Sequence, residues 1–300
     1  MKKINGDNIK GFLNRILYFI QCISDHGKGS NHSCDIYNPT LSVSNIDTIG
    51  KTPSRILCDY FWNSINFENL KIQLNSNFNI IDIGCGSGVY GEFLKKITGK
   101  FFGDYTGLDI YKHQDFPLEF KHIKAKAEGI YNYIDKKTNF VISQSSLEHI
   151  EEDKYVLEKT TKKLIENKIP FIQIHMVPAS LSLWLYLWHG YRQYSKKNLS
   201  NISNELKKNF DVNTFIVPIG GKLSFWTHFK YVTLPVYIKK ILMNDQLYKW
   251  YSKKNIQKKI IKNVSKELEC KHQSPIFWAL VITPNNINIM EKLIKNLSPK

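Results

Sequence analysis

The sequence lacks the cysteine pattern of a metal-bound or disulfide-rich protein. Its five cysteines, Cys22, Cys34, Cys58, Cys85 and Cys270, lie far apart and form no Cys-x-x-Cys pair. This spacing argues against a cysteine zinc site and against a dense disulfide framework. The His, Asp and Glu residues show no grouping with the spacing of metal ligands either. We therefore expect no metal ion and a reducing, cytoplasmic location.

Long apolar runs are also missing. No run of 18 or more apolar residues is free of polar interruptions, so no membrane-spanning helix is expected. The segment 1–7 lacks the apolar core and small-residue cleavage site of a secretory signal. The sequence thus predicts neither a membrane span nor secretion.

Acidic residues are scarce, with 26 Asp and Glu against 42 Lys and Arg, for a formal net charge of +16. Such an excess commonly indicates a nucleic-acid or anionic-membrane partner. Here the lysines are spread along a chain that is also heavy in Asn and Ile, as an AT-rich genome would produce. Nucleic acid is therefore not the favoured partner. The 300 residues, 42% of them hydrophobic, suffice for one α/β domain with additions.

The most informative segment is 79–91, in which an apolar strand leads into a glycine-rich turn and then a helix. Glycines at such a turn let backbone N–H groups approach a nucleotide. The first glycine after the strand is Gly84, so a dinucleotide fingerprint written over Gly86, Gly88 and Gly91 is two residues out of register. Asp82 would repel a pyrophosphate, but it suits a cofactor with a cationic amino-acid end. S-adenosylmethionine is such a cofactor.

A second carboxylate supports this interpretation. The segment 104–110 is predicted to be the next strand, and Asp109 ends it about 20 residues after the turn. A carboxylate at that place can accept hydrogen bonds from both ribose hydroxyls.

Together these segments resemble the class I S-adenosylmethionine-dependent methyltransferases, in the branch whose fourth strand is followed by Leu-Glu-His. The resemblance covers roughly residues 50–180 and includes 138–150 as the fourth-strand motif. It implies that S-adenosylmethionine is bound, and S-adenosylhomocysteine released, by Asp82, Gly84, Cys85, Gly86, Gly88, Tyr90, Asp109, Ile110, Ala127, Glu128, Gln144 and Ser145. Asn139 and Lys126 stand where the family often has acidic residues. Lys126 leaves the adenine amino group to the backbone of Ala127 or to Glu128.

The alternation of strands and helices predicts a Rossmann-like α/β fold of seven mostly parallel strands between helices. Strands are expected near 78–83, 104–109, 120–124, 139–144, 169–175, 213–217 and 275–283. In the family resembled, the seventh strand runs antiparallel between the fifth and sixth. Residues 1–70 are expected to form a helical extension or lid, with helices over 9–23 and 53–67 and an irregular segment over 26–52. The domain over 71–300 would carry helical insertions at about 176–210 and 219–273.

Methyl transfer needs alignment of the reactants and, for a hydroxyl acceptor, a base. His149 and His175 are expected at the carboxyl ends of the fourth and fifth strands, and His189 follows in the first insertion. These three are the candidate catalytic residues, and His228 is a weaker one. The candidate acceptor-binding residues are Tyr191, Arg192 and Tyr194, where Arg192 would suit a phosphate or carboxylate.

Two apolar segments leave alternatives open. The segment 181–188 is apolar on nearly every side, which favours a buried cap helix over a membrane contact. The amphipathic helix over 9–23 is expected to pack on the domain, with a role as a site cap or a membrane contact as the alternatives.

We expect O-methylation of a sugar or other small polar metabolite, a glycan included, in bacterial surface-polysaccharide biosynthesis. Methylation of a lipid or an RNA is the alternative, and a non-catalytic cofactor-binding scaffold is a further one. The protein is expected in the cytoplasm, and a peripheral contact with the inner face of the membrane is left open. The sequence does not indicate the oligomeric state.

Overall fold

The computed structural model describes residues 3–29, 34–42, 48–242, 251–269, 274–287 and 289–295. Parts of the segment 26–52 and of the insertion 219–273 lie outside these residues, as does Cys270. The described strands form one sheet in the order β1-β7-β8-β6-β5-β2-β3-β4. Their bounds are Asp35–Ile36 (β1), Phe78–Ile83 (β2), Phe102–Asp109 (β3), Lys121–Lys124 (β4), Phe140–Gln144 (β5), Ile172–Pro178 (β6), Val212–Ile219 (β7) and Phe277–Pro284 (β8).

The predicted topology is confirmed. The strands pair in parallel except β8, which runs antiparallel between β6 and β7. The sheet has eight strands rather than seven because the two-residue β1 pairs with β7 at the edge, Asp35 opposite Phe215. β2 and β5 are buried almost throughout because helices cover both faces of the sheet.

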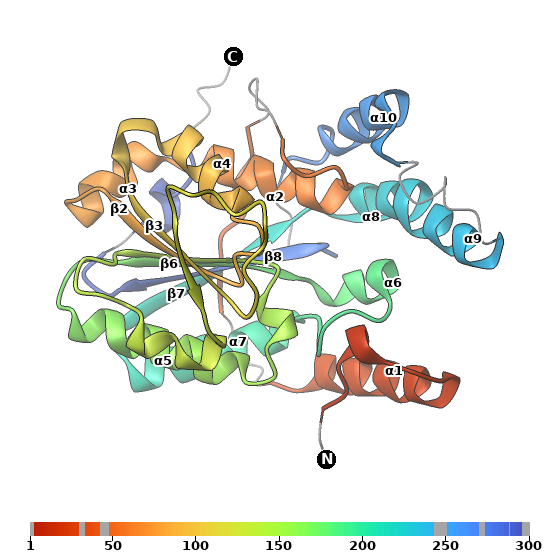
Figure 1. Cartoon of the computed structure of the whole chain (residues 1–300), viewed down its shortest axis with the longest axis horizontal. Coiled ribbons are helices and arrows are strands. Elements are labelled where there is room, and N and C mark those ends of the chain that lie inside the picture. The colour runs from red at the N-terminus through yellow and green to blue at the C-terminus, as the bar shows by residue number, and fades with distance from the viewer. Residues whose placement is uncertain are drawn as a thin grey trace.

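Two layers of helices enclose the sheet (Figure 1). α2, α3 and α4 cover one face, and α5 and α7 cover the other. The helices are Phe12–Gly27 (α1), Pro53–Ser64 (α2), Phe67–Leu74 (α3), Val89–Thr98 (α4), Asp153–Glu166 (α5), Leu183–Tyr186 (α6), Lys196–Asn209 (α7), Lys222–His228 (α8), Leu234–Leu242 (α9) and Lys254–Val264 (α10).

The first predicted insertion is smaller than its 35 residues suggest. α7 belongs to the fold itself, because Leu199, Ile202 and Leu206 bury one side of it among the core residues beneath β7 and β8. A capping box between Ser195 and Asn198 fixes its first turn. The additional part of this insertion is therefore the segment from about 179 to 195, which contains the short helix α6.

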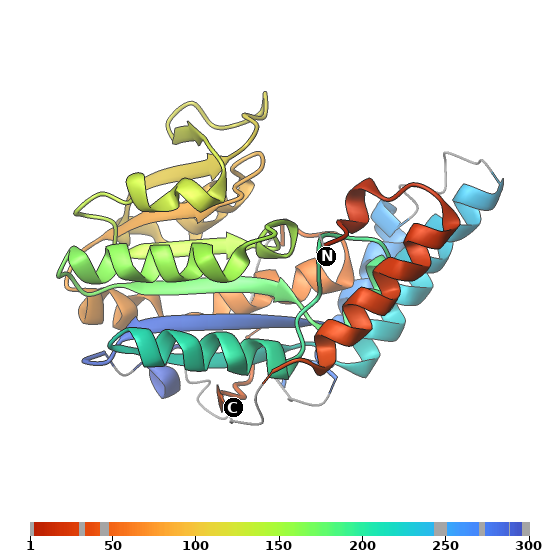
Figure 2. The ribbon, with the colours of Figure 1, turned by 90° about the horizontal axis from the view of Figure 1, so that it is seen from below.

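α1, α6, α8 and α9 gather at one end of the molecule (Figures 1 and 2). The prediction of a helix near 9–23 is confirmed, but the expectation that its apolar side packs on the domain is wrong. Tyr18 and Cys22 are its buried residues. Six large apolar side chains face solvent instead: Phe12, Leu13, Ile16, Leu17, Ile20 and Ile23.

The segment 181–188 is likewise not one buried cap helix. It forms a 3-10 turn and the four-residue α6, in which Leu183 and Leu185 are buried while Trp184 is exposed. A search of the described helices finds none that combines the length and the hydropathy needed to cross a bilayer.

Candidate active site

The glycine turn lies where β2 ends and α4 begins, at the middle of the parallel part of the sheet. Gly84 has a φ of 72°, and a Cβ there would lie 2.4 Å from the Cβ of Ser146. Only glycine lets the turns that follow β2 and β5 approach this closely. Gly88, also at positive φ, is the N-cap of α4. The sequence-predicted cradle is therefore formed, with its backbone N–H groups at a helix N-terminus.

Asp82 lies beneath this turn and is 1% exposed. Its Oδ2 accepts a hydrogen bond from the Tyr105 hydroxyl at 2.6 Å, while Oδ1 has no partner among the described residues. The pKa of Asp82 is raised to about 7 mainly by burial; the Tyr105 hydrogen bond opposes this rise and the nearby Asp109 adds to it. A buried carboxylate oxygen without a partner is suited to a cationic or hydrogen-bonding ligand group.

Asp109 is held at the end of β3 by two backbone donors. Its Oδ2 accepts from the Gly86 N–H at 2.9 Å, and its Oδ1 accepts from the Tyr111 N–H at 3.2 Å. These bonds orient the carboxylate toward the space beside the glycine turn. The predicted position of this residue, at the end of the second strand of the βαβ unit, is confirmed.

A cavity of about 520 Å³ lies beside Asp109 at the carboxyl ends of the strands. Its volume is in the usual range for a small-molecule site. Predicted site residues contribute much of its lining: Gly84, Asp109, Ile110, Ala127, Glu128, Ser145, His149 and Tyr191. The structure therefore brings the predicted ribose side, the adenine side and one candidate base to a single cavity.

Other predicted cofactor residues lie behind this lining. The Tyr90 hydroxyl donates to Asp59 at 3.0 Å, and the Cys85 side chain is buried in the core. Gln144 accepts from the Trp62 indole N–H at 2.8 Å, and its own amide nitrogen is buried without a partner in the described structure. Gln144 thus keeps a free donor at the end of β5.

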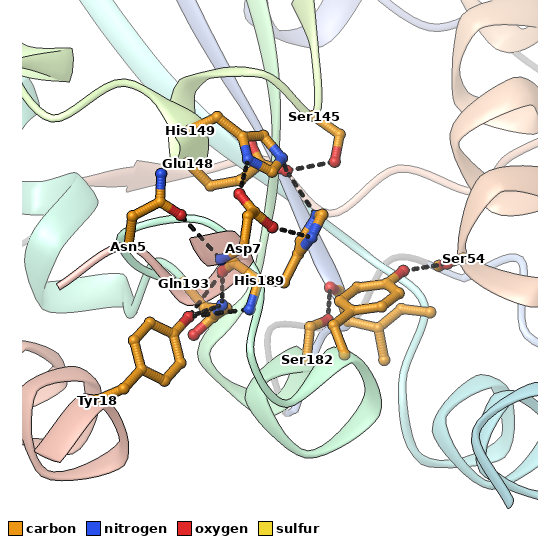
Figure 3. A network of polar contacts seen from close by, with 12 residues as sticks. Asn5, Asp7, Tyr18, Ser54, Ser145, Glu148, His149, Ser182, His189 and Gln193 are labelled. Atoms are coloured by element: carbon orange, nitrogen blue, oxygen red, sulfur yellow. Dashed lines mark hydrogen bonds and ion pairs between the residues drawn. The ribbon is translucent and has the colours of Figure 1, made fainter. Parts of the chain in front are cut away.

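His149 and His189 come together in a cluster with Asp7 (Figure 3). The Nδ1 of His149 lies 2.7 Å from Asp7 Oδ2, and the Nδ1 of His189 lies 3.3 Å from Asp7 Oδ1. The two imidazole centres are 4.5 Å apart and meet edge to face. Both rings also turn their Nε2 atoms toward Glu148 Oε1, at 4.0 and 3.9 Å. Two imidazoles therefore lie between two carboxylates at the cavity wall.

The N-terminal segment is fixed to this wall by its backbone. The Gly6 N–H donates to the Gly190 carbonyl at 2.6 Å, and a Cβ on Gly6 would lie 2.4 Å from the His189 nitrogen. Tyr18 of α1 donates its hydroxyl to the His189 carbonyl at 2.7 Å. Because of these contacts, η1 (Gly6–Asn8) presents Asp7 to both imidazoles.

The charges in the cluster reinforce one another. Although burial raises it, the pKa of the Asp7 carboxyl is held well below its usual range by the hydrogen bonds and charges of His149 and His189. The pKa of His149 is raised, because bonding to Asp7 and the charge of Glu148 outweigh the effect of burial. Ser145, at a positive φ of 55°, donates its hydroxyl to Glu148.

The expectation that His175 ends a strand at the rim of the site is wrong. β6 continues to Pro178, so His175 lies inside the strand and is 0% exposed. Its Nδ1 lies 2.9 Å from Ser143 Oγ, and its Nε2 lies 3.2 Å from Gln173 Oε1. Burial lowers the pKa of His175 to about 3. His175 therefore belongs to a polar network within the core and does not reach an acceptor.

Arg192 and Tyr194 do not face an acceptor either. The Arg192 guanidinium binds Asp153 and the Glu151 carbonyl, and the Tyr194 hydroxyl donates to Asp153 at 2.6 Å. Tyr194 is 1% exposed. These groups tie the loop after α6 to the start of α5. His228 is also buried, and burial lowers its pKa to about 3.

Sequence reasoning missed Asp7 and Asp59. Asp59 of α2 accepts from the Gly50 N–H at 2.7 Å and from Tyr90, and burial raises its pKa to about 6. No local spacing identifies either residue, because their partners lie in other parts of the chain. Glu148 was visible in the Leu-Glu-His motif, but its orientation toward the two histidines was not.

No protein-family model and no curated protein matches the chain. Among solved structures, it is similar to the plantazolicin methyltransferase BamL in complex with a substrate analogue and S-adenosylhomocysteine, at 17% identity over 77% of this chain and 85% of that chain, with a TM-score of 0.49. It is also similar to the plantazolicin methyltransferase BpumL, at 15% identity over 76% of this chain and 84% of that chain, with a TM-score of 0.47. A third similar structure is a SAM-dependent methyltransferase from Archaeoglobus fulgidus, at 16% identity over 72% of this chain and 90% of that chain, with a TM-score of 0.42.

The sheet order and the placement of the turn identify the fold independently of these values. The sheet is parallel except for its last strand, β8, which runs antiparallel between β6 and β7, and a glycine turn follows β2. This is the arrangement predicted for a class I S-adenosylmethionine-dependent methyltransferase. The chain has this fold.

Proposed function

We propose that the protein is a methyltransferase that uses S-adenosylmethionine and transfers the methyl group to a hydroxyl oxygen. The observation that carries the proposal is the cavity at the strand ends, which has Asp109 and the glycine turn on one side and His149 on the other. In this assignment Asp109 accepts the ribose hydroxyls, and the backbone near Ala127, with Glu128, faces the adenine. Asp82 acts from beneath the turn on the amino-acid end.

The reaction balances with the groups at the site. The carbon–sulfur bond of the sulfonium breaks as the oxygen–carbon bond forms, and S-adenosylhomocysteine leaves without the sulfonium charge. The acceptor proton passes to His149, whose orientation Asp7 fixes through Nδ1. The remaining contribution is alignment of the two reactants. Residues 1–70 would act as a lid, because Asp7 reaches the site from this extension.

For the acceptor we propose a sugar or other small polar metabolite of bacterial surface-polysaccharide biosynthesis. The cavity lining supports this class of acceptor. His149 and Tyr191 line the cavity, and His189 is next to His149. These side chains offer hydrogen bonds and a ring face to a polyol. Under this proposal the protein acts in the cytoplasm.

Calorimetric titration of S-adenosylhomocysteine into the purified protein tests the cofactor before the acceptor is known. Binding is expected, followed by turnover in a screen of nucleotide sugars and glycans. No binding would contradict the proposal. Binding without turnover over a broad acceptor panel would favour a non-catalytic scaffold.

A specific observation favours a second candidate, in which the acceptor is carried by a lipid. The six apolar side chains along α1 are exposed, Phe12 by 75% and Leu13 by 74%. Trp184 of α6 and Trp226 of α8 are more than half exposed. Their helices lie at the same end of the molecule as α1 (Figure 1). An apolar helix face of this size is typical of an interfacial helix that lies in a membrane surface.

Basic side chains accompany this face. Arg15 is exposed on α1 and Lys10 just before it, and Lys222 and Lys230 are exposed at α8 and just beyond it. Together with the net charge of +16 they complement an anionic bilayer. We therefore propose that α1 and α8 bind the inner face of an anionic membrane, a peripheral contact measurable by vesicle sedimentation.

An apolar cavity of about 230 Å³ lies between this end of the molecule and the histidine cluster. Leu185, Trp188, Val232 and Val236 line it, as does Tyr186. The Tyr186 ring centre is 5.4 Å from that of His189. The cavity gives the apolar part of a lipid-borne acceptor a place next to the reacting group. Activity on lipid-linked but not on free acceptors would select this candidate.

A further inference from the structure

The histidine cluster has more ligand atoms than a single proton transfer requires. Asp7, His149 and His189 each offer one atom, and these three atoms lie within 4.8 Å of one another. Glu148 adds a second carboxylate about 4 Å from both Nε2 atoms. The four side chains come from η1, η4 (Leu147–His149) and the loop after α6. Three separate segments thus converge on one point.

Glu148 is a buried carboxylate beside the same two rings. Its side chain is 0% exposed, and its Oε2 is buried without a partner in the described structure. Its Oε1 accepts a hydrogen bond from Ser145 and points toward the two imidazoles. A carboxylate that faces the second nitrogen of a metal-binding imidazole holds the ring in place, as is common around histidine ligands.

We propose that Asp7, His149 and His189 bind a divalent transition-metal ion through one nitrogen of each ring, while Glu148 faces the other nitrogen of both rings. This inference rests on the proposed function, because the ion would lie at the wall of the cofactor cavity and coordinate the acceptor oxygen. It revises the expectation of no metal drawn from sequence spacing.

The donor set selects the class of ion. Two imidazole nitrogens and one carboxylate suit Zn²⁺, Mn²⁺ or Co²⁺, whereas Mg²⁺ and Ca²⁺ prefer oxygen donors alone. Bonds of about 2.1 Å place ligand atoms up to about 4.2 Å apart across an ion. The separation of 3.3 Å between His189 Nδ1 and Asp7 Oδ1 falls within this limit. The direct contact between Asp7 and His149, at 2.7 Å, has to lengthen slightly to admit the ion.

The charges are compatible with a divalent ion. Asp7 and Glu148 are the two carboxylates of the cluster, and the half-buried Arg55 offsets part of the negative charge of Glu148 from the side of α2. A cation between the imidazoles would balance the remaining charge. It would also join η1 to the end of β5, so that the N-terminal lid is fixed when the ion is bound.

With an ion bound, the group that receives the proton of the acceptor hydroxyl is different. A hydroxyl coordinated to the ion loses its proton to water more easily, so that the oxygen is anionic when it meets the methyl group. Without an ion, His149 takes this proton and Asp7 orients the ring. The two arrangements predict different requirements for metal, which makes them separable by experiment.

The test is equilibrium dialysis of untagged, chelator-treated protein against Mn²⁺, Co²⁺ and Zn²⁺ in turn, with metal analysis of the retained protein. We expect one equivalent of at least one ion. Asp7→Asn and His189→Ala should each weaken this binding at least about tenfold, whereas the matched control His113→Ala, on an exposed loop, should leave it unchanged. Binding of Co²⁺ should also produce the visible absorption of an imidazole-coordinated ion.

Titration of S-adenosylhomocysteine into the same samples separates this inference from the proposed function. Failure of all three ions to bind, or binding that Asp7→Asn and His189→Ala leave unchanged, overturns the metal site. If S-adenosylhomocysteine still binds and metal-free protein turns over, the methyltransferase proposal stands and His149 is the base. If S-adenosylhomocysteine does not bind, the methyltransferase proposal fails, whatever the result with metals. Melting curves of each variant show whether it is folded.

Discussion

Asp7 Oδ2 lies 2.7 Å from His149 Nδ1, although 142 positions separate the two residues. This contact joins the N-terminal extension to the turn after β5, at the wall of the cofactor cavity. The N-terminal extension therefore contributes a carboxylate that contacts a histidine of the candidate site.

The first prediction concerns this link. Asp7→Asn removes the charge that both imidazoles face, so η1 should open more often while the sheet is unaffected. Hydrogen exchange of residues 6–9 should accelerate by about tenfold. Asp25→Asn, which removes an exposed pair with Lys28 on α1, is the control and should change the exchange little. Equal exchange in the two variants would show that the contact does not hold the segment.

The cofactor assignment gives a second prediction. Asp109→Ala should weaken S-adenosylhomocysteine binding at least about tenfold, or about 1.4 kcal/mol, because the ribose hydroxyls lose a fixed acceptor. Asp104→Ala is the matched control, since Asp104 lies on the same strand but is exposed at the other end. Its calorimetric affinity should equal that of the wild type. Equal losses in the two variants would place the cofactor elsewhere.

The third prediction concerns Gly190, which has a φ of 65°, and where a Cβ would lie 2.5 Å from the Glu148 carbonyl oxygen. Gly190→Ala should lower stability by about 1–3 kcal/mol through strain at this position. Gly129→Ala is the control, because a Cβ there meets only Tyr133 at 3.6 Å. Urea unfolding of the two variants measures the difference. If the two variants unfold at the same urea concentration, the loop that contains Gly190 adjusts to the added methyl group without a loss of stability.

The exposed face of α1 gives a fourth prediction. Leu13→Gln with Leu17→Gln should reduce sedimentation with anionic vesicles at least about tenfold, because each leucine loses a transfer free energy of about 1.5–3 kcal/mol. Ile72→Gln is the control, since Ile72 is an equally exposed apolar residue on α3. Neutral vesicles should bind the wild type less well than anionic ones. If the wild type sediments with neither kind and instead self-associates, a second copy covers the face.

The fifth prediction follows from the buried His175, whose folded pKa of about 3 lies below its ordinary value of 6.5. Between these values the unfolded chain binds a proton that the folded chain does not. The stability associated with a neutral His175 is therefore complete above about pH 6.5 and is lost as the pH falls toward 3.

His175→Gln removes this titration. The difference in unfolding free energy between wild type and variant should shift by about 3 kcal/mol in favour of the variant between pH 7.5 and pH 4.5. Urea unfolding at the two pH values measures it, with the exposed His113→Gln as the control. A difference independent of pH would show that His175 is protonated in the folded protein.

The sequence by itself determined the glycine turn and the mostly parallel sheet of alternating strands and helices. The strand, the glycines and Asp82 are contiguous, and Asp109 follows one helix later, so local spacing specifies their geometry. The antiparallel place of β8 followed from the family resemblance and is confirmed.

The tertiary structure alone decided which groups meet at the reacting end. Asp7, His149 and His189 converge because the N-terminal segment and the loop after α6 fold onto the same strand ends, and no sequence spacing encodes that contact. His175 lies inside β6, which continues to Pro178, whereas His149 lies in η4, beyond the end of β5. For α1, the hydrophobic period identifies an apolar side but not what covers it, since that depends on the path of every neighbouring segment.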